Sequence, residues 1–189
     1  TATTEIYTLS LHDALPICDN RVIFISYYSY NAEKYNEFDI HPYFVKAFKK
    51  RWYVIAHSPG TDDVRCYALD RMERVIISDK VFKMPKDLEP AEYFKDCFGI
   101  INNKDSEVQK VVLKVDAFQS NYIRNLPLHE SQKEAKRTEE YSIFEYHLKP
   151  EFDFEQEIFS NMDAMEVLEP LWLREEVKER IKNLASKYL

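Results

Sequence analysis

Apolar and polar residues alternate along the first half of the chain in a pattern that predicts short β-strands. Residues 21–30, RVIFISYYSY, are almost wholly β-branched or aromatic, a composition that is typical of strands. Alternation places Ser26 and Tyr28 on one face of this strand and Ile25 and Tyr27 on the other. The same kind of pattern predicts four more strands, at residues 38–48, 52–57, 64–70 and 72–78. Five sequential strands with no long helix between them favour a small antiparallel barrel or a strongly curved sheet.

The second half of the chain switches between strand and helix periodicity. It predicts strands at 111–115, 128–137, 141–149 and 165–170, and helices at 117–126 and 152–161. This order, βαββαβ, is that of a ferredoxin-like sandwich. Residues 171–189 are expected to close the chain as an amphipathic helix, with an apolar stripe of Val177, Ile181, Leu184 and Tyr188. The fold class predicted for the whole chain is α+β.

A charged segment bracketed by Pro85 and Pro90 separates the two halves, and such a segment is typical of a domain boundary. We predict a first domain over residues 18–85 and a second over 106–189. The linker between them, residues 86–105, is expected to contain a short helix at 91–98.

The first seventeen residues, TATTEIYTLSLHDALPI, look like an in-frame translation of a short-read sequencing adapter. A signal peptide is the competing interpretation, but the segment has no basic start and no continuous apolar run. We therefore expect residues 1–17 not to be native, and the gene fragment to be truncated before Cys18. The segment contains Glu5 and Asp13 and no Lys or Arg, so its removal changes the net charge from −7 to −5.

Composition narrows the range of functions. Because the chain is acidic, contact with nucleic acid must be confined to a local patch, and broad binding to duplex DNA is not expected. No apolar run is long enough to span a membrane, and three cysteines, Cys18, Cys66 and Cys97, are too few for a disulfide framework or a zinc site. We therefore expect a soluble cytoplasmic protein. The two glycines of the chain predict few turns with positive φ.

The most informative segment runs from residue 41 to residue 75, where two β-prone stretches flank the turn SPGTDD. Its core motif is Trp52-Tyr53-Val54, followed after the turn by Arg65, Tyr67, Leu69, Asp70 and Arg71. This pattern resembles the WYL domain of bacterial transcriptional regulators. The final segment, EVLEPLWLREEVKERI, resembles the C-terminal extension that follows this domain in many of these regulators. The resemblance covers residues 18–189.

The resemblance implies an Sm/SH3-like β-barrel that binds single-stranded DNA, RNA or a nucleotide, followed by the ferredoxin-like domain. Regulators of this kind generally carry an N-terminal helix-turn-helix that reads duplex operator DNA, which we expect to be missing here. A homodimer is also implied. The identity of the ligand, and whether it activates or represses, are left open by the sequence.

Arg65 and Arg71 are the leading candidates for ligand contact, because a guanidinium can clamp a phosphate through two N–H groups and can stack on a base. The alternative is a solvated arginine paired with a nearby carboxylate, namely Asp62, Asp63 or Glu73. Strict alternation would place both arginines on one strand face together with Leu69, so we expect a bulge or a strand end near Asp70.

Ser26, Tyr28, His41 and Tyr53 form a second group of candidates, because hydroxyl and imidazole groups bond phosphate oxygens and aromatic rings stack on bases. The alternatives are half-buried strand residues for the two tyrosines and a turn residue for His41. Trp52 is expected to pack in the core.

The densest basic cluster consists of Lys46, Lys49, Lys50 and Arg51. It could follow a phosphate backbone or keep a sheet edge soluble, and we favour the second interpretation. Arg124 and Arg174 could reach the same ligand if the domains or a dimer partner fold over it.

Motifs of enzymes are not found: the sequence has no glycine-rich phosphate loop, no C-x-x-C and no G-x-S-x-G. We expect no catalytic residue, no metal site and no cofactor. The alternative function is a protein interaction or dimerisation module, or a stand-alone accessory protein, that takes no small ligand.

Overall fold

The computed structural model describes residues 17–189, apart from the side chain of Met162. The proposed adapter segment, residues 1–17, therefore lies outside the described residues except for Ile17. The chain divides into two compact units between Leu88 and Glu89, which falls within the linker predicted at 86–105.

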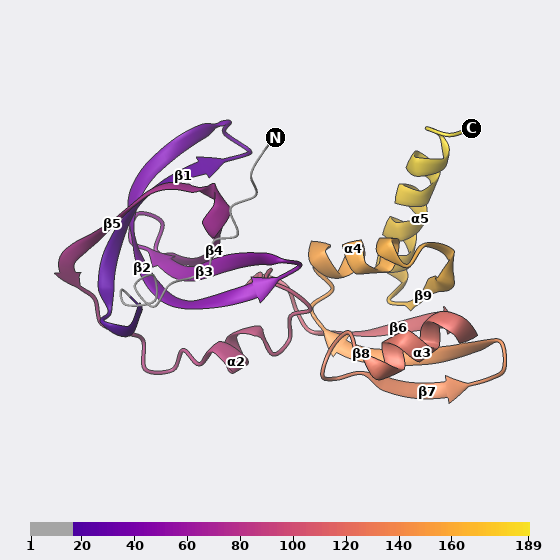
Figure 1. Cartoon of the computed structure of the whole chain (residues 1–189). Coiled ribbons are helices and arrows are strands. Elements are labelled where there is room, and N and C mark those ends of the chain that lie inside the picture. Colours follow the sequence, from indigo (N-terminus) through magenta and orange to yellow (C-terminus); the bar gives the residue numbers. More distant parts are fainter. Residues whose placement is uncertain (1–16) are drawn as a thin grey trace. The chain divides into compact units, whose positions relative to one another are not determined.

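The first unit is built on a five-stranded antiparallel sheet (Figure 1). Its strands are β1 (Arg21–Ser29), β2 (Lys34–Phe48), β3 (Arg51–Ser58), β4 (Asp63–Ala68) and β5 (Met72–Val81). The order across the sheet is β4-β3-β2-β1-β5. All five strands were predicted, but β2 begins four residues before the expected start at Phe38.

The core of this sheet is formed by alternate residues, as the period of the sequence predicts. Ile23, Ile25 and Tyr27 of β1 pack with Ile40 of β2 and with Val54, Ala56 and Tyr67 from the strands beyond it. Residues 34–40 of β2 pair with β1 and residues 41–48 pair with β3. A bulge at Tyr43 shifts the register within the second pairing. The sheet bends around this shared core (Figure 1).

Of the two predicted forms, a small barrel or a strongly curved sheet, the described residues form an open, curved sheet and no closed barrel. Assignment to the Sm/SH3-like class stays a prediction. Among these residues β4 pairs with β3 alone and β5 with β1 alone, so both are edges of an open sheet. The break lies between Ala68 and Met72, where the 3-10 turn η1 (Leu69–Arg71) separates β4 from β5. The strand end that we expected near Asp70 is therefore present.

Tight turns in this unit do not depend on glycine. Among the described residues, five other than glycine have positive φ: Asn20, Glu33, Lys49, Lys50 and Asp62. Lys49 and Lys50 form the two-residue hairpin between β2 and β3, where turns of the primed types require positive φ. Polar residues thus take the positions with positive φ that glycine usually fills.

The second unit contains a four-stranded antiparallel sheet with the order β7-β8-β6-β9 (Figure 1). Its elements are α2 (Pro90–Phe94), β6 (Gln109–Asp116), α3 (Ala117–Asn125), β7 (Lys133–Arg137), β8 (Tyr141–Leu148), α4 (Phe152–Ser160), η2 (Met162–Ala164), β9 (Met165–Glu169) and α5 (Leu171–Ala185). From β6 to β9 the order is the βαββαβ that the sequence predicted. Assignment to the ferredoxin-like class stays a prediction.

One face of this second sheet carries the core. Leu113, Phe144 and Val167 from three of its strands pack against Phe154 of α4 and Leu173 of α5. The segment before β6 is tied to this unit, because the buried Asp153 carboxylate accepts hydrogen bonds from the backbone N–H groups of residues 100 and 101. Part of the predicted linker is thus an integral piece of the second unit.

Among residues 17–189, no helix is long and apolar enough to cross a membrane.

Candidate functional site

Arg71 occupies the 3-10 turn between β4 and β5, and its guanidinium is held against the end of β1. The Nε and Nη2 atoms donate to the carbonyl oxygen of Tyr28 at 2.9 and 2.6 Å. The Cζ atom lies 4.5 Å from the ring centroid of Tyr27 and 4.2 Å from that of Tyr30. Because rings of this kind attract a guanidinium, Arg71 is positioned by three contacts at once.

The same geometry leaves Arg71 able to bind an anion. A guanidinium has five N–H donors, and the Tyr28 carbonyl engages two of its nitrogen atoms. In the part of the chain that the structure describes, no carboxylate forms an ion pair with Arg71, although its neighbour Asp70 pairs with Arg51. The remaining donors can therefore meet a phosphate oxygen or the edge of a base.

A second cation lies beside this turn. Arg51 Nη2 is 3.1 Å from Asp70 Oδ2, with both side chains about half exposed. Partial burial by itself lowers the pKa of Arg51. The charge of Asp70 and a hydrogen bond with Tyr53 raise it by a larger amount together, so the pKa of Arg51 lies above its ordinary value. Arg51 and Asp70 come together because Tyr53 pairs with Ala68, which brings the start of β3 to the end of β4.

Of the six predicted site residues, Arg71, Tyr28 and Tyr53 lie around this turn. Tyr28 supplies its carbonyl, while its ring makes edge contacts with Tyr30 at 5.7 Å and Tyr35 at 5.1 Å. Both Tyr28 and Tyr53 are half-buried strand residues, which was the alternative to ligand contact that the sequence left open for them. Ser26 lies two residues before Tyr28 on β1 but is only 4% exposed, so it cannot touch a ligand in this conformation.

Arg65 has a different environment. It lies on β4 opposite Ala56, and its Nε is 3.4 Å from Asp63 Oδ2. This is the pairing with a carboxylate that the sequence left open as the alternative. Two tyrosines separate the arginines: Tyr67, beside Arg65, meets Tyr27 edge to face at 5.2 Å, and Tyr27 lies under Arg71.

His41 belongs to another cluster. It lies opposite His57 and stacks on Phe82 with ring centroids 4.8 Å apart. Along β2 it is six residues from Tyr35, the partner of Tyr28, a path of roughly 20 Å for extended chain. Burial lowers the pKa of His41, as does the neighbouring His57, against a smaller opposite effect of Asp39. The structure does not bring His41 together with Arg71.

The basic cluster and Trp52 lie at the hairpin between β2 and β3. Trp52 is 43% exposed, so its predicted place in the core is wrong. The reason is its position opposite Ala47, two residues after the hairpin residue Lys50, where the strand leaves the exposed turn. Arg51 is the member of the basic cluster that reaches the turn at Arg71 through Asp70.

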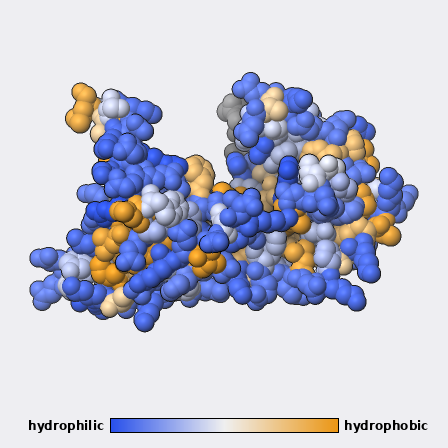
Figure 2. Space-filling model, turned by 180° about the vertical axis from the view of Figure 1, so that it is seen from behind, coloured by the Kyte–Doolittle hydropathy of each residue, from blue (hydrophilic) through white to orange (hydrophobic). Residues whose placement is uncertain are grey.

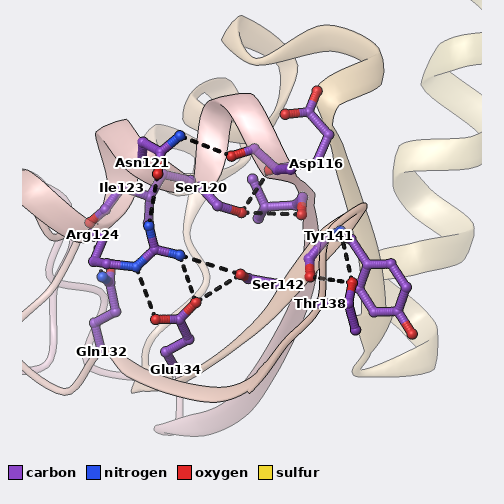
Figure 3. Close-up of polar contacts among 12 residues, drawn as sticks. Asp116, Ser120, Asn121, Ile123, Arg124, Gln132, Glu134, Thr138, Tyr141 and Ser142 are labelled. Atoms are coloured by element: carbon purple, nitrogen blue, oxygen red, sulfur yellow. Dashed lines mark hydrogen bonds and ion pairs between the residues drawn. The ribbon is translucent and has the colours of Figure 1, made fainter.

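Arg124 and Arg174 are engaged in ion pairs within the second unit. Arg124 donates from Nε to Glu134 Oε2 at 2.9 Å and from Nη2 to Glu134 Oε1 at 2.7 Å. The Ser142 hydroxyl donates to the same carboxylate (Figure 3). Arg174 pairs with Glu166 and also donates to the Val167 carbonyl. The structure gives these two arginines local structural partners in place of the ligand contact that we considered.

Sequence reasoning missed Tyr27, Tyr30 and Asp70 as parts of the site. Tyr27 was placed on the core face, which is correct, but its ring also supports Arg71 at the edge of the core. The one feature of the sequence that could have indicated them is the presence of Tyr27 and Tyr30 on either side of Tyr28, whose carbonyl binds Arg71. Within residues 17–189 no group of three His, Cys, Asp or Glu side chains could hold a metal ion.

Comparison with known families decides the identity of both units. The WYL domain matches residues 10–77 and the WCX domain matches residues 107–185. The chain carries a WYL domain followed by a WCX domain. Arg71 and its turn lie inside the WYL domain, and the Arg124–Glu134 pair lies inside the WCX domain.

Solved structures are similar to this WYL protein at low identity. A CRISPR Cas-related protein is 12% identical with a TM-score of 0.55, over 91% of this chain and 48% of that chain. Proteasome accessory factor B/C (PafBC) of Arthrobacter aurescens is 17% identical with a TM-score of 0.37, over 93% of this chain and 26% of that chain. This chain thus spans about half and about a quarter of their lengths, and the first likeness shows a shared fold. No curated protein matches the sequence.

Proposed function

We propose that this chain is the ligand-sensing region of a transcriptional regulator, and that its WYL domain binds single-stranded nucleic acid or a nucleotide at Arg71. The observation that carries the proposal is the guanidinium of Arg71, which is fixed by the Tyr28 carbonyl and two tyrosine rings and pairs with no described carboxylate. A fixed guanidinium loses little conformational entropy when it binds a planar or phosphate ligand.

The surroundings of Arg71 favour a nucleotide over a simple anion. Tyr30, whose ring lies against Arg71, is 59% exposed, so it offers a ring face on which a base can stack. Arg51 adds a second positive charge next to the same turn. Cations and exposed aromatic rings brought together at one place are the groups by which proteins bind single-stranded nucleic acids.

The regulatory mechanism that we propose is a shift between two arrangements of a homodimer. A ligand can cause such a shift only if it binds one arrangement more tightly than the other. Duplex operator DNA would be read by an N-terminal helix-turn-helix outside this sequence. The proposed function is binding, with no catalytic step.

The test is a titration of the chain with labelled single-stranded oligonucleotides and with nucleotides, followed by fluorescence anisotropy. We expect Arg71→Ala to weaken binding about tenfold or more, because a hydrogen bond to a charged group contributes about 1.5–3 kcal/mol. Arg65→Ala should have a smaller effect, because Arg65 is already paired with Asp63. Arg137→Ala, a substitution of an exposed arginine on β7, is the matched control. Equal affinities for Arg71→Ala and Arg137→Ala would show that Arg71 is not the binding residue.

Self-association without a small ligand is the second candidate function. Exposed apolar residues include Phe118 and Tyr122 on α3, Leu126 directly after it, and Ile181, Leu184 and Tyr188 near the C-terminus. Apolar patches interrupt the mostly hydrophilic surface (Figure 2). Sedimentation of wild type and Leu184→Glu distinguishes the two candidates. A dimer that Leu184→Glu dissociates, in a chain that binds no oligonucleotide, would favour self-association.

A further inference from the structure

The hairpin between β2 and β3 concentrates positive charge in a chain that is acidic as a whole. Lys46, Lys49, Lys50 and Arg51 fall within six residues, and residues 40–61 contain no Asp or Glu. Solubility alone would be served equally well by acidic side chains. A stretch of this length without acidic residues, in a chain that has 33 of them, is better explained by contact with an anion.

The tip of this hairpin is occupied by two lysines where other residues would suit the backbone better. Lys49 and Lys50 have φ of 44° and 65° and connect the paired residues Phe48 and Arg51. Both lysines are exposed, and Lys49 Nζ lies 5.6 Å from the Phe48 ring centroid. Two-residue turns with positive φ at both positions favour Asn-Gly. The stability of the turn therefore does not account for the lysines.

Arg51 connects the hairpin to the turn that holds Arg71. It follows Lys50 in the chain, and its Nη2 atom lies 3.1 Å from the carboxylate of Asp70, the residue before Arg71. Two residues further along β3, Tyr53 pairs with the end of β4. The extended chain from Lys50 to Tyr53 covers about 10 Å. Positive charge thus continues from the Arg71 turn to the tip of the hairpin, over a path longer than the spacing of neighbouring phosphates in a strand.

The register of the hairpin places rings and charges on one face. Lys46 pairs with Tyr53, and Phe48 pairs with Arg51. Because alternate residues of a strand share a face, these four side chains lie on the same face of the hairpin. Arg51 is exposed and the other three are half-buried. Cations interleaved with aromatic rings are the combination that binds a single strand through its phosphates and bases.

We propose that the β2–β3 hairpin is the second part of the ligand site, and that the ligand is a single-stranded oligonucleotide whose phosphates run from Arg71 past Arg51 to Lys49 and Lys50. A free nucleotide reaches the Arg71 turn alone. The proposal rests on the proposed function of the WYL domain and specifies its ligand as a strand of several nucleotides. The hairpin lysines, for which sheet-edge solubility was the favoured interpretation, are thereby given a role in binding.

The test uses a variant that removes both charges from the tip of the hairpin and keeps its turn. Lys49→Asn with Lys50→Gly does so, because Asn-Gly favours positive φ at both positions. The matched control is Lys83→Asn with Lys86→Asn, which removes the same charge from exposed residues after β5. Fluorescence anisotropy measures the affinity of each variant for a labelled single strand of about ten nucleotides at a series of salt concentrations.

We expect the hairpin variant to bind the oligonucleotide more weakly than the control does. The slope of log affinity against log salt concentration should become shallower by about 1.4, because each lost phosphate contact accounts for about 0.7 in a single strand. The affinity for deoxythymidine monophosphate, measured by calorimetry, should be equal in the two variants, since this ligand does not reach the tip of the hairpin.

Equal oligonucleotide affinity and equal salt slope in the hairpin variant and the control would overturn the proposal. A monophosphate affinity that falls as much as the oligonucleotide affinity would overturn it too, because the lysines would then act through general attraction. Arg71→Ala separates the two proposals. If it weakens binding of both ligands while the hairpin variant does not, the Arg71 site stands and the hairpin contact fails. Absence of any oligonucleotide binding to wild type would overturn both.

Discussion

Arg71 and Tyr28 are joined by two hydrogen bonds, from the Nε and Nη2 atoms of the arginine to one backbone carbonyl oxygen, at 2.9 and 2.6 Å. This contact connects the turn after β4 to the end of β1, which lie 43 residues apart in the sequence. It fixes the guanidinium in position before any ligand arrives. Preorganisation of this kind reduces the entropy that binding must overcome.

Tyr27 supports the turn from below, and we predict that Tyr27→Phe destabilises the WYL domain by about 1–2 kcal/mol. The Tyr27 hydroxyl accepts a hydrogen bond from the buried backbone N–H of Ala68 at 3.2 Å, and its removal leaves that donor without this partner. Urea denaturation measures the change in the free energy of unfolding. Tyr30→Phe is the control, because Tyr30 is 59% exposed. Equal stability of the two variants would contradict a structural role for the Tyr27 hydroxyl.

His41 predicts a loss of stability in mild acid. Burial, followed by the charge of His57, lowers the pKa of His41 below its ordinary 6.5. The charge of Asp39 raises this pKa by a smaller amount. Because the unfolded chain then binds a proton more readily, the stability present above pH 6.5 is lost as the pH falls towards the folded pKa. Thermal melting between pH 7.5 and pH 5 should show this slope, and His41→Gln should reduce it. The slope should persist in His147→Gln, a change of an exposed histidine on β8.

The Arg124–Glu134 pair predicts an acid-sensitive contribution to the WCX domain. Hydrogen bonds from Arg124, and then from Ser142, lower the pKa of Glu134 to about 2. Its contribution is therefore complete above the ordinary value of 4.5 and is lost as the pH falls to about 2. We expect Glu134→Gln to reduce the free energy of unfolding by about 1 kcal/mol at pH 7, and by nothing measurable near pH 2. A constant difference across this pH range would show that the carboxylate charge is not the cause.

The strands and helices could be predicted because each depends on local pattern. The alternate residues Ile23, Ile25 and Tyr27 of β1 line the core as expected, although Val22 and Ser26 on the other face are buried as well. The βαββαβ order of the second unit follows from switches in period. Sheet closure could not be predicted, since it depends on whether β4 and β5 pair across the chain. The turn at residues 69–71 decides that question, and no periodicity describes a turn of three residues.

The sequence singled out Arg71 as a candidate, but it did not indicate which side chains surround Arg71 in the fold. Arg71 belongs to the motif that resembles the WYL domain. A strand end near Asp70 was expected because strict alternation would have placed Leu69 on the same face as the two arginines. Arg65 and Arg71 share that motif, yet one pairs with Asp63 and the other binds the carbonyl of Tyr28. Pairing choices such as these depend on three-dimensional register. Trp52 was misplaced for the same reason, because its exposure follows from its position beside the hairpin.

The most direct measurement is the anisotropy of a labelled single-stranded oligonucleotide titrated with wild type and with Arg71→Lys. Lysine keeps the positive charge but lacks the planar fork that the Tyr28 carbonyl and the tyrosine rings position. The account predicts that Arg71→Lys binds about tenfold more weakly than wild type, while its melting temperature stays within the range of the Arg137→Lys control. Equal oligonucleotide affinity of Arg71→Lys and wild type would contradict recognition by the preorganised guanidinium.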